Sequence, residues 1–94
     1  MKLKTTPWDP SEYLDSLESI AAYLEAVFED GDPSLIAAAL GDIARAMGMT
    51  QLASQAGVTR EALYKALSPT GDPRLSTFLG VIRALGIKLT PHAA

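Results

Sequence analysis

The side chains with the clearest chemical pattern lie between positions 59 and 68. In an α-helix beginning at Arg60, the polar residues that follow would lie within about 140° of its side chain, because each residue turns the helix by about 100°. These polar residues are Glu61, Tyr64, Lys65 and Ser68, and the others are Ala62, Leu63, Ala66 and Leu67. One face is therefore predicted to be anchored in a core, and the other to present charged and hydrogen-bonding groups to a ligand.

Such a helix has the size and the side chains needed to enter the major groove of DNA. Arg60 can pair with guanine through two hydrogen bonds, and Glu61 can accept a hydrogen bond from the amine of cytosine. Tyr64 can contact a phosphate or a thymine methyl group. The predicted base-edge residues are Thr59, Arg60, Glu61, Tyr64, Lys65 and Ser68. The alternative for each of them is a solvated surface side chain.

Phosphate groups of DNA bind to the amides of helix starts and turns. The predicted phosphate contacts are Thr50, Gln51, Thr70, Gly71 and Arg74, with Thr59 and Lys65 as additions. Arg83 and Lys88 are expected to be surface charges or dimer contacts.

Enzymatic chemistry finds little support in the sequence. The single histidine, His92, lies three residues from the end of the chain, and Ser11, Ser16 and Ser19 have no histidine nearby in sequence. No calcium-loop spacing and no glycine-rich phosphate motif occurs. We therefore expect no catalytic residue, no metal site and no cofactor.

Composition describes a globular protein of 94 residues with 48% hydrophobic residues, 20% charged residues and no cysteine. The lack of cysteine suits a reducing compartment. No apolar run approaches the roughly 18 residues of a membrane span, and the first ten residues lack the apolar core of a signal peptide. A cytoplasmic protein is expected.

Charge is distributed unevenly along the chain. Residues 1–48 carry three basic and nine acidic side chains, a net charge of −6, whereas residues 49–94 carry five basic and two acidic ones, a net charge of +3. This asymmetry suggests two partners of different charge, with chance in a short chain as the alternative.

Residues typical of helix starts and helix ends predict five helices and no other regular element before residue 87. An Asp15-x-x-Glu18 capping box begins the first helix and Gly31 ends it, while Asp32-Pro33 begins the second and Gly48 ends it. Thr50 is predicted to cap a third helix at about 51–56, and Thr59 a fourth at about 60–67. A fifth is expected at about 75–85, ending at Gly86.

The ends of the chain are predicted to be simpler. Residues 1–14 are expected to be extended, followed by a single domain at 15–94. Ile87-Lys88-Leu89 is either a loose tail or a short strand.

Apolar residues at helical spacing give the predicted inner faces. They are Leu17, Ile20, Ala21, Leu24, Val27 and Phe28 in the first helix, Ile36, Ala39, Leu40, Ile43 and Met47 in the second, and Leu75, Phe78, Leu79, Ile82 and Leu85 in the fifth.

The segment at about 50–68 meets the requirements of a helix-turn-helix. Ala53 is small enough for two helices to cross closely, and Gly57, four residues later, tolerates the positive φ of the turn. Leu52, Val58 and Leu63 can hold both helices to the body. Two short core helices joined by a glycine turn would meet some of these requirements by accident.

From about Pro7 to Leu89, the chain resembles the addiction-module antidote proteins, which are HigA-like antitoxins of the Cro-like (XRE) helix-turn-helix superfamily. The resemblance rests on Asp32-Pro33, on 40–46 (LGDIARA), on Gly48-Met49-Thr50, on 56–68 (AGVTREALYKALS), on Gly71-Asp72-Pro73 and on Ala84-Leu85-Gly86. General Cro-like repressors have two additional polar residues between the Thr-Gln pair and the Leu-Ala pair, which are adjacent here as Thr50-Gln51 and Leu52-Ala53. The shorter form here matches the antidote subgroup.

The resemblance implies an all-α domain that binds operator DNA as a dimer, represses its own operon and neutralises a small basic toxin of the RelE/ParE group. With a basic toxin, the acidic half gains a role, and the predicted toxin contacts are Trp8, Glu18, Glu25, Glu29 and Asp30. The alternative is a solvated acidic face. The fifth helix and residues 87–89 are expected to form the dimer interface.

Two other functions remain open at this point. One is a free-standing repressor, for example of phage origin, without a toxin. The other is a protein-interaction module whose helix-turn-helix has lost DNA binding.

Overall fold

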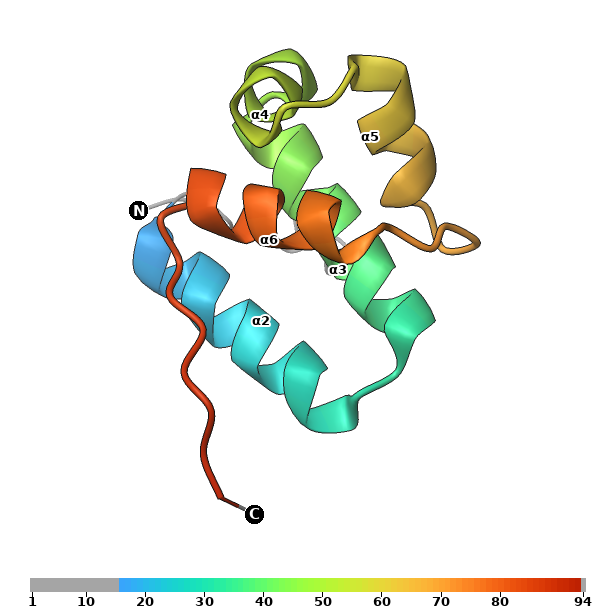
Figure 1. The fold of residues 1–94 in the computed structure, drawn as a ribbon. Helices are drawn as coiled ribbons and strands as arrows, with labels where there is room; N and C mark the ends of the chain where they lie inside the picture. The colour runs from blue at the N-terminus through green and yellow to red at the C-terminus, as the bar shows by residue number, and fades with distance from the viewer. Residues whose placement is uncertain (1–15, 94) are drawn as a thin grey trace, which may run out of the picture.

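The computed structural model describes residues 16–93 and contains five α-helices in that range, joined by short connections (Figure 1). The helices are α2 (Leu17–Asp30), α3 (Pro33–Met47), α4 (Met49–Ala56), α5 (Arg60–Ala66) and α6 (Leu75–Ala84). For residues 16–93, the predictions of five helices and of no other regular element before residue 87 are confirmed.

The first two helices form a pair joined by only Gly31 and Asp32. Asp32 caps α3, because its carboxylate accepts a hydrogen bond from the amide of Ser34 at 3.0 Å, and Pro33 occupies the first helical position. The predicted start of α2 was one residue too early. Ser16 is the N-cap, with its hydroxyl oxygen 3.1 Å from the amide nitrogen of Ser19, and Asp15 lies outside the described residues.

The third predicted helix, in contrast, begins earlier than expected. Gly48 is the N-cap of α4 and makes no side-chain capping bond, so Thr50 is the second helical residue rather than the cap. Thr59 caps α5 as predicted, since its hydroxyl oxygen accepts a hydrogen bond from the amide of Ala62 at 3.0 Å.

One hydrophobic cluster connects all five helices. Its members are Ile20 and Leu24 of α2, Leu40, Ile43 and Ala44 of α3, Met49, Leu52 and Ala53 of α4, Leu63 and Leu67 at α5, and Val81, Ile82 and Leu85 at α6. Phe28 and Phe78 meet edge to face beside it, with ring centroids 6.3 Å apart. Because α5 and α6 both contribute to this cluster, their positions are fixed relative to α3.

Several residues predicted for the inner faces are exposed. Leu75 is 70% exposed, and Leu79, Leu17 and Met47 are also exposed, as is Ala21. The apolar faces predicted from the helical period are wider than the area that the neighbouring helices cover, and these residues lie at the edges of those faces.

The end of the chain after Leu85 is irregular and passes beside α2 (Figure 1). Residues 87–93 contain no strand, so the loose-tail alternative for Ile87-Lys88-Leu89 is the correct one. Among residues 16–93, no helix combines the length and the apolar character that crossing a membrane requires.

Candidate nucleic-acid interface and acidic face

The α4–α5 unit (Met49–Ala66) is two short helices linked by Gly57, Val58 and Thr59. Gly57 has φ +79°, a left-handed conformation that glycine adopts without a steric penalty. The amide of Val58 donates to the carbonyl of Ala53 at 3.0 Å, and Ala53 itself is buried. The turn and the small residue predicted from sequence therefore lie where a tight helix-turn-helix connection needs them.

Helix α5 has one buried and one exposed side. Leu63 and Leu67 are almost completely buried, whereas Arg60, Glu61, Tyr64 and Lys65 are exposed, Tyr64 by 62%. The predicted division holds for these six residues and fails for Ala62, which is exposed. Ala62 lies at the border of the core-facing side, where no other helix covers it.

The exposed side of α5 brings three of the predicted residues together. Arg60, Glu61 and Tyr64 line one shallow hollow of about 260 Å³. Within the described part of the chain, neither Arg60 nor Lys65 forms an ion pair. Their charges are therefore available to an external partner.

Ser68 and Gly71 form hydrogen bonds within the chain at the end of α5. Helix α5 ends at Ala66, and the Ser68 hydroxyl donates to the carbonyl oxygen of Lys65 at 2.9 Å. The amide of Gly71 donates to the carbonyl oxygen of Ser68 at 2.8 Å, so it is not free for a phosphate. Both residues shape the end of α5, with Thr70 exposed beside them.

Two glycines hold the C-terminal end of α5, a feature that sequence analysis missed. A Cβ at Gly41 of α3 would overlap the carbonyl oxygen of Leu67, and one at Gly71 would overlap the carbonyl oxygens of Lys65 and Ala66. Such close approach requires glycine on both sides. Both glycines stand in motifs noted in the sequence, but their pairing around α5 is visible only in three dimensions.

Three further predicted phosphate contacts, Thr50, Gln51 and Arg74, lie on exposed surface. Thr50 and Gln51 occupy the first turn of α4, which has no side-chain cap, so their amides are free of intrahelical acceptors. Arg74 is exposed and occupies the N-cap position of α6.

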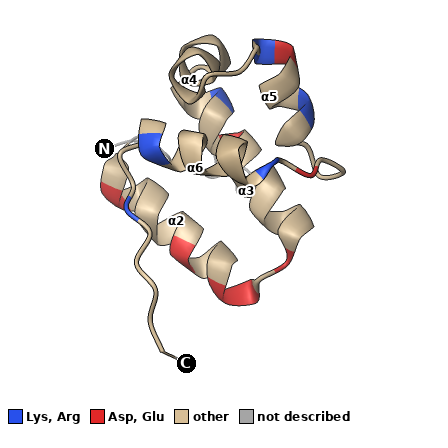
Figure 2. Cartoon of the chain, viewed as in Figure 1, with Lys and Arg blue, Asp and Glu red and all other residues tan. Residues whose placement is uncertain are grey.

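Helix α2 carries the acidic residues predicted to bind a toxin. Glu18, Glu25, Glu29 and Asp30 are all exposed, and residues 16–32 contain no lysine or arginine. Figure 2 shows acidic residues along α2 and at its end, and Lys and Arg on α5, on α6, at the end of α3 and on the tail, where Lys88 lies beside α2. Trp8, the fifth predicted contact, lies outside the described residues.

A polar bridge joins the two N-terminal helices. The hydroxyl of Tyr23 donates to Oδ2 of Asp42 at 3.3 Å, while Arg45 pairs with Oδ1 of the same carboxylate. Burial raises the pKa of Tyr23, and the negative charge and hydrogen bond of Asp42 raise it further. No group of acidic or histidine residues within 16–93 is arranged to hold a metal ion.

Comparison with known proteins connects these features to a family. A family model described as "Probable addiction module antidote protein" matches residues 4–93. An uncharacterized protein of Haemophilus influenzae is 47% identical over 81 residues, covering 86% of this chain and 84% of the relative. No solved structure matches the chain. The match spans both the acidic α2 and the α4–α5 unit, and the chain therefore belongs to the family of addiction module antidote proteins, which suggests a role in neutralising a toxin.

Proposed function

We propose that this protein is a dimeric antitoxin of the Cro-like (XRE) helix-turn-helix superfamily. In this proposal it binds and neutralises a basic toxin of the RelE/ParE type, and it represses its own operon by binding operator DNA through α5. Family membership supports the toxin-neutralising part, and the geometry of α5 supports the DNA-binding part.

The observation that carries the DNA-binding proposal is the two-sided character of α5. Leu63 and Leu67 fix the helix to the core, and no described side chain pairs with Arg60 or Lys65 on its other side. A rigid helix with unpaired cationic and hydrogen-bonding groups is suited to the major groove. Arg60 would read guanine, and Glu61 and Tyr64, in the same hollow, would contact neighbouring bases.

Contacts to the DNA backbone would flank this helix. The free amides of Thr50 and Gln51 at the start of α4 suit one phosphate, and Lys65 and Arg74 add positive charge. Thr59 contributes as well, because its hydroxyl oxygen accepts the capping bond and its proton remains available to a phosphate.

Dimerisation would be provided by α6. Leu75 and Leu79 are exposed, lie one helical turn apart and carry no charge, so they form an apolar strip that a second copy can cover. Two copies would place two α5 helices about 34 Å apart, one turn of DNA, on a palindromic operator.

A mobility-shift titration with the upstream region of the protein's own gene tests the DNA-binding role. The wild-type chain is expected to shift this fragment at low salt, and the Arg60→Ala/Lys65→Ala double variant to bind at least about 30-fold more weakly, since each lost contact costs about 1–3 kcal/mol. Lys88→Ala, which removes an exposed cation from the tail beside α2, outside both α5 and α6, is the matched control.

Two results would contradict this role. One is the absence of any shift by the wild-type chain at low salt, and the other is equal binding by the wild-type chain and the double variant. Circular dichroism of both proteins confirms that the fold is intact in each case.

A further inference from the structure

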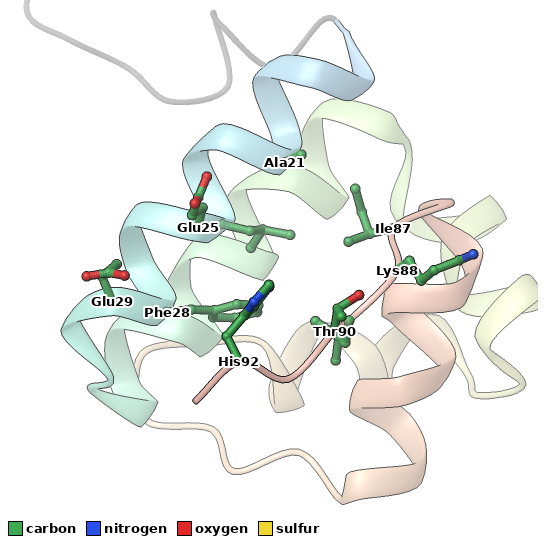
Figure 3. A pocket seen from close by; sticks show the side chains of 10 residues that line it. Ala21, Glu25, Phe28, Glu29, Ile87, Lys88, Thr90 and His92 are labelled. Atoms are coloured by element: carbon green, nitrogen blue, oxygen red, sulfur yellow. The ribbon is translucent and has the colours of Figure 1, made fainter. Parts of the chain in front are cut away.

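A groove runs between α2 and the C-terminal tail (Figure 3), with a volume of about 590 Å³. Its apolar lining comes from Leu24 and Phe28 on the helix and from Ile87 and Leu89 on the tail. Leu24 is buried, Phe28 and Ile87 are half-buried and Leu89 is 42% exposed. The groove therefore offers an apolar floor to a partner side chain.

Carboxylates line the helical edge of this groove. Glu25 and Glu29 lie one turn apart on α2, and Figure 3 shows them along the outer side of the helix while Phe28 points toward the tail. Both carboxylates are exposed, and neither forms an ion pair with any residue in 16–93. A partner that supplies lysine or arginine here gains two charge pairs without breaking an existing one.

A second copy of this chain is a poor occupant of the groove. A two-fold symmetric contact brings the same patch of both copies together, and each patch holds two carboxylates, Glu25 and Glu29, against one lysine, Lys88, so negative charge would be in excess. The uncharged leucines of α6 lie elsewhere and suit a second copy better.

We infer that the toxin docks in this groove through a segment that presents basic side chains beside at least one apolar side chain. The inference rests on the proposed antitoxin function and specifies its surface. The apolar group occupies the space between Phe28 and Leu89, and the basic groups pair with Glu25 and Glu29. The groove and the hollow on the outward side of α5 share no lining residue.

Calorimetric titration of the full chain with the purified protein encoded by the gene adjacent to its own tests the inference. The wild-type chain is expected to bind this protein, and its affinity is expected to fall as the salt concentration is raised. Glu25→Lys/Glu29→Lys is expected to bind at least about 30-fold more weakly, because attraction becomes repulsion at two positions. Leu89→Asn is expected to reduce affinity by about tenfold through the lost apolar contact. The affinity of the single variant Glu25→Lys is compared with that of Asp72→Lys. Asp72→Lys is the control, because it makes the same charge reversal at an exposed position in the loop after α5, outside the groove.

A second measurement locates the contact independently of the variants. In amide spectra of the ¹⁵N-labelled chain, unlabelled partner is expected to shift the signals of 21–29 and 87–92 more than those of α5. Thermal melting of each variant shows whether it is folded.

The outcomes separate the groove from the function. If the wild-type chain binds the partner and neutralises it in co-expression, and Glu25→Lys/Glu29→Lys binds equally well, the groove is not the docking site and the antitoxin role stands. If the shifted signals lie elsewhere, the groove is also wrong. If wild-type chain does not bind at all, both are wrong.

Discussion

Gly71 packs directly against the backbone of Ala66, so closely that a Cβ at position 71 would overlap the carbonyl oxygen of Ala66. The φ angle of Gly71 is not in the left-handed region, so alanine is acceptable there except for this overlap. The contact determines how the loop after α5 supports the end of the helix.

We expect Gly71→Ala to destabilise the fold by about 1–3 kcal/mol, as overpacking against an immobile backbone does. Because the loop or the end of α5 must move, operator binding is expected to weaken even below the melting temperature. Urea unfolding and a mobility-shift titration measure the two effects. Asp72→Ala, at the next and exposed position, is the control and is expected to change stability by less than about 0.5 kcal/mol.

Arg60 and Lys65 are expected to affect DNA binding in different ways. Arg60→Ala should lose about 1–3 kcal/mol on the operator and much less on unrelated DNA, because a base contact is removed. Lys65→Ala should weaken both by similar factors and lower the salt dependence by about one charge, because a phosphate contact is removed. Titrations at several salt concentrations on both DNAs check this, and identical behaviour of the two variants would contradict the assignment.

Tyr23→Phe is expected to lower the free energy of unfolding by about 0.5–1.5 kcal/mol near neutral pH, since the hydrogen bond to Asp42 is lost while the ring remains. In the wild type, the raised pKa of Tyr23 means that the folded state holds its proton more tightly than the unfolded state, whose pKa is near 10.0. This stabilisation is complete below about pH 10 and disappears as the pH rises through the folded-state pKa.

The difference in melting temperature between wild type and Tyr23→Phe should therefore shrink at alkaline pH. Thermal melts from neutral to strongly alkaline solution measure it. A difference that stays constant or widens would show that the hydroxyl has another role.

The prediction of a dimer depends on two exposed leucines of α6, Leu75 and Leu79. Leu75→Glu/Leu79→Glu is expected to produce a monomer at micromolar concentration, because two charges would enter a contact that is apolar in the wild type. Sedimentation measures the mass, and operator affinity should fall with it. Leu17→Glu, at another exposed leucine, on α2, serves as the control and should leave the mass unchanged. A wild-type chain that is already monomeric would contradict the prediction.

Much of this fold could be predicted from local chemistry. The cap residues Asp32 and Thr59 and the turn residue Gly57 act within three or four residues of the chain, so sequence spacing alone located them. The outward arc of α5 followed from helical period for the same reason. Thr50 was wrong as a cap because the N-cap is Gly48, two residues earlier, and glycine has no side chain whose type could indicate a cap in the sequence.

The remaining features depend on contacts between distant segments. The exposure of Leu75 depends on how far the neighbouring helices extend, which periodicity does not contain. The same holds for the groove between α2 and residues 87–92, since a tail without regular structure has no period from which its position could be predicted. Ser68 was assigned to the outward face by extending the helical rotation one residue past the expected end of the helix, whereas its hydroxyl donates to the carbonyl oxygen of Lys65.

The outward side chains of Arg60, Glu61, Tyr64 and Lys65 take no part in the hydrophobic core or in any hydrogen bond or ion pair within residues 16–93. Exchanging them costs little folding free energy. Mutation can therefore rewrite what this surface recognises while the scaffold persists. On the proposed DNA-binding function, duplicated copies of such a gene could diverge to regulate separate operons through changes at a few codons.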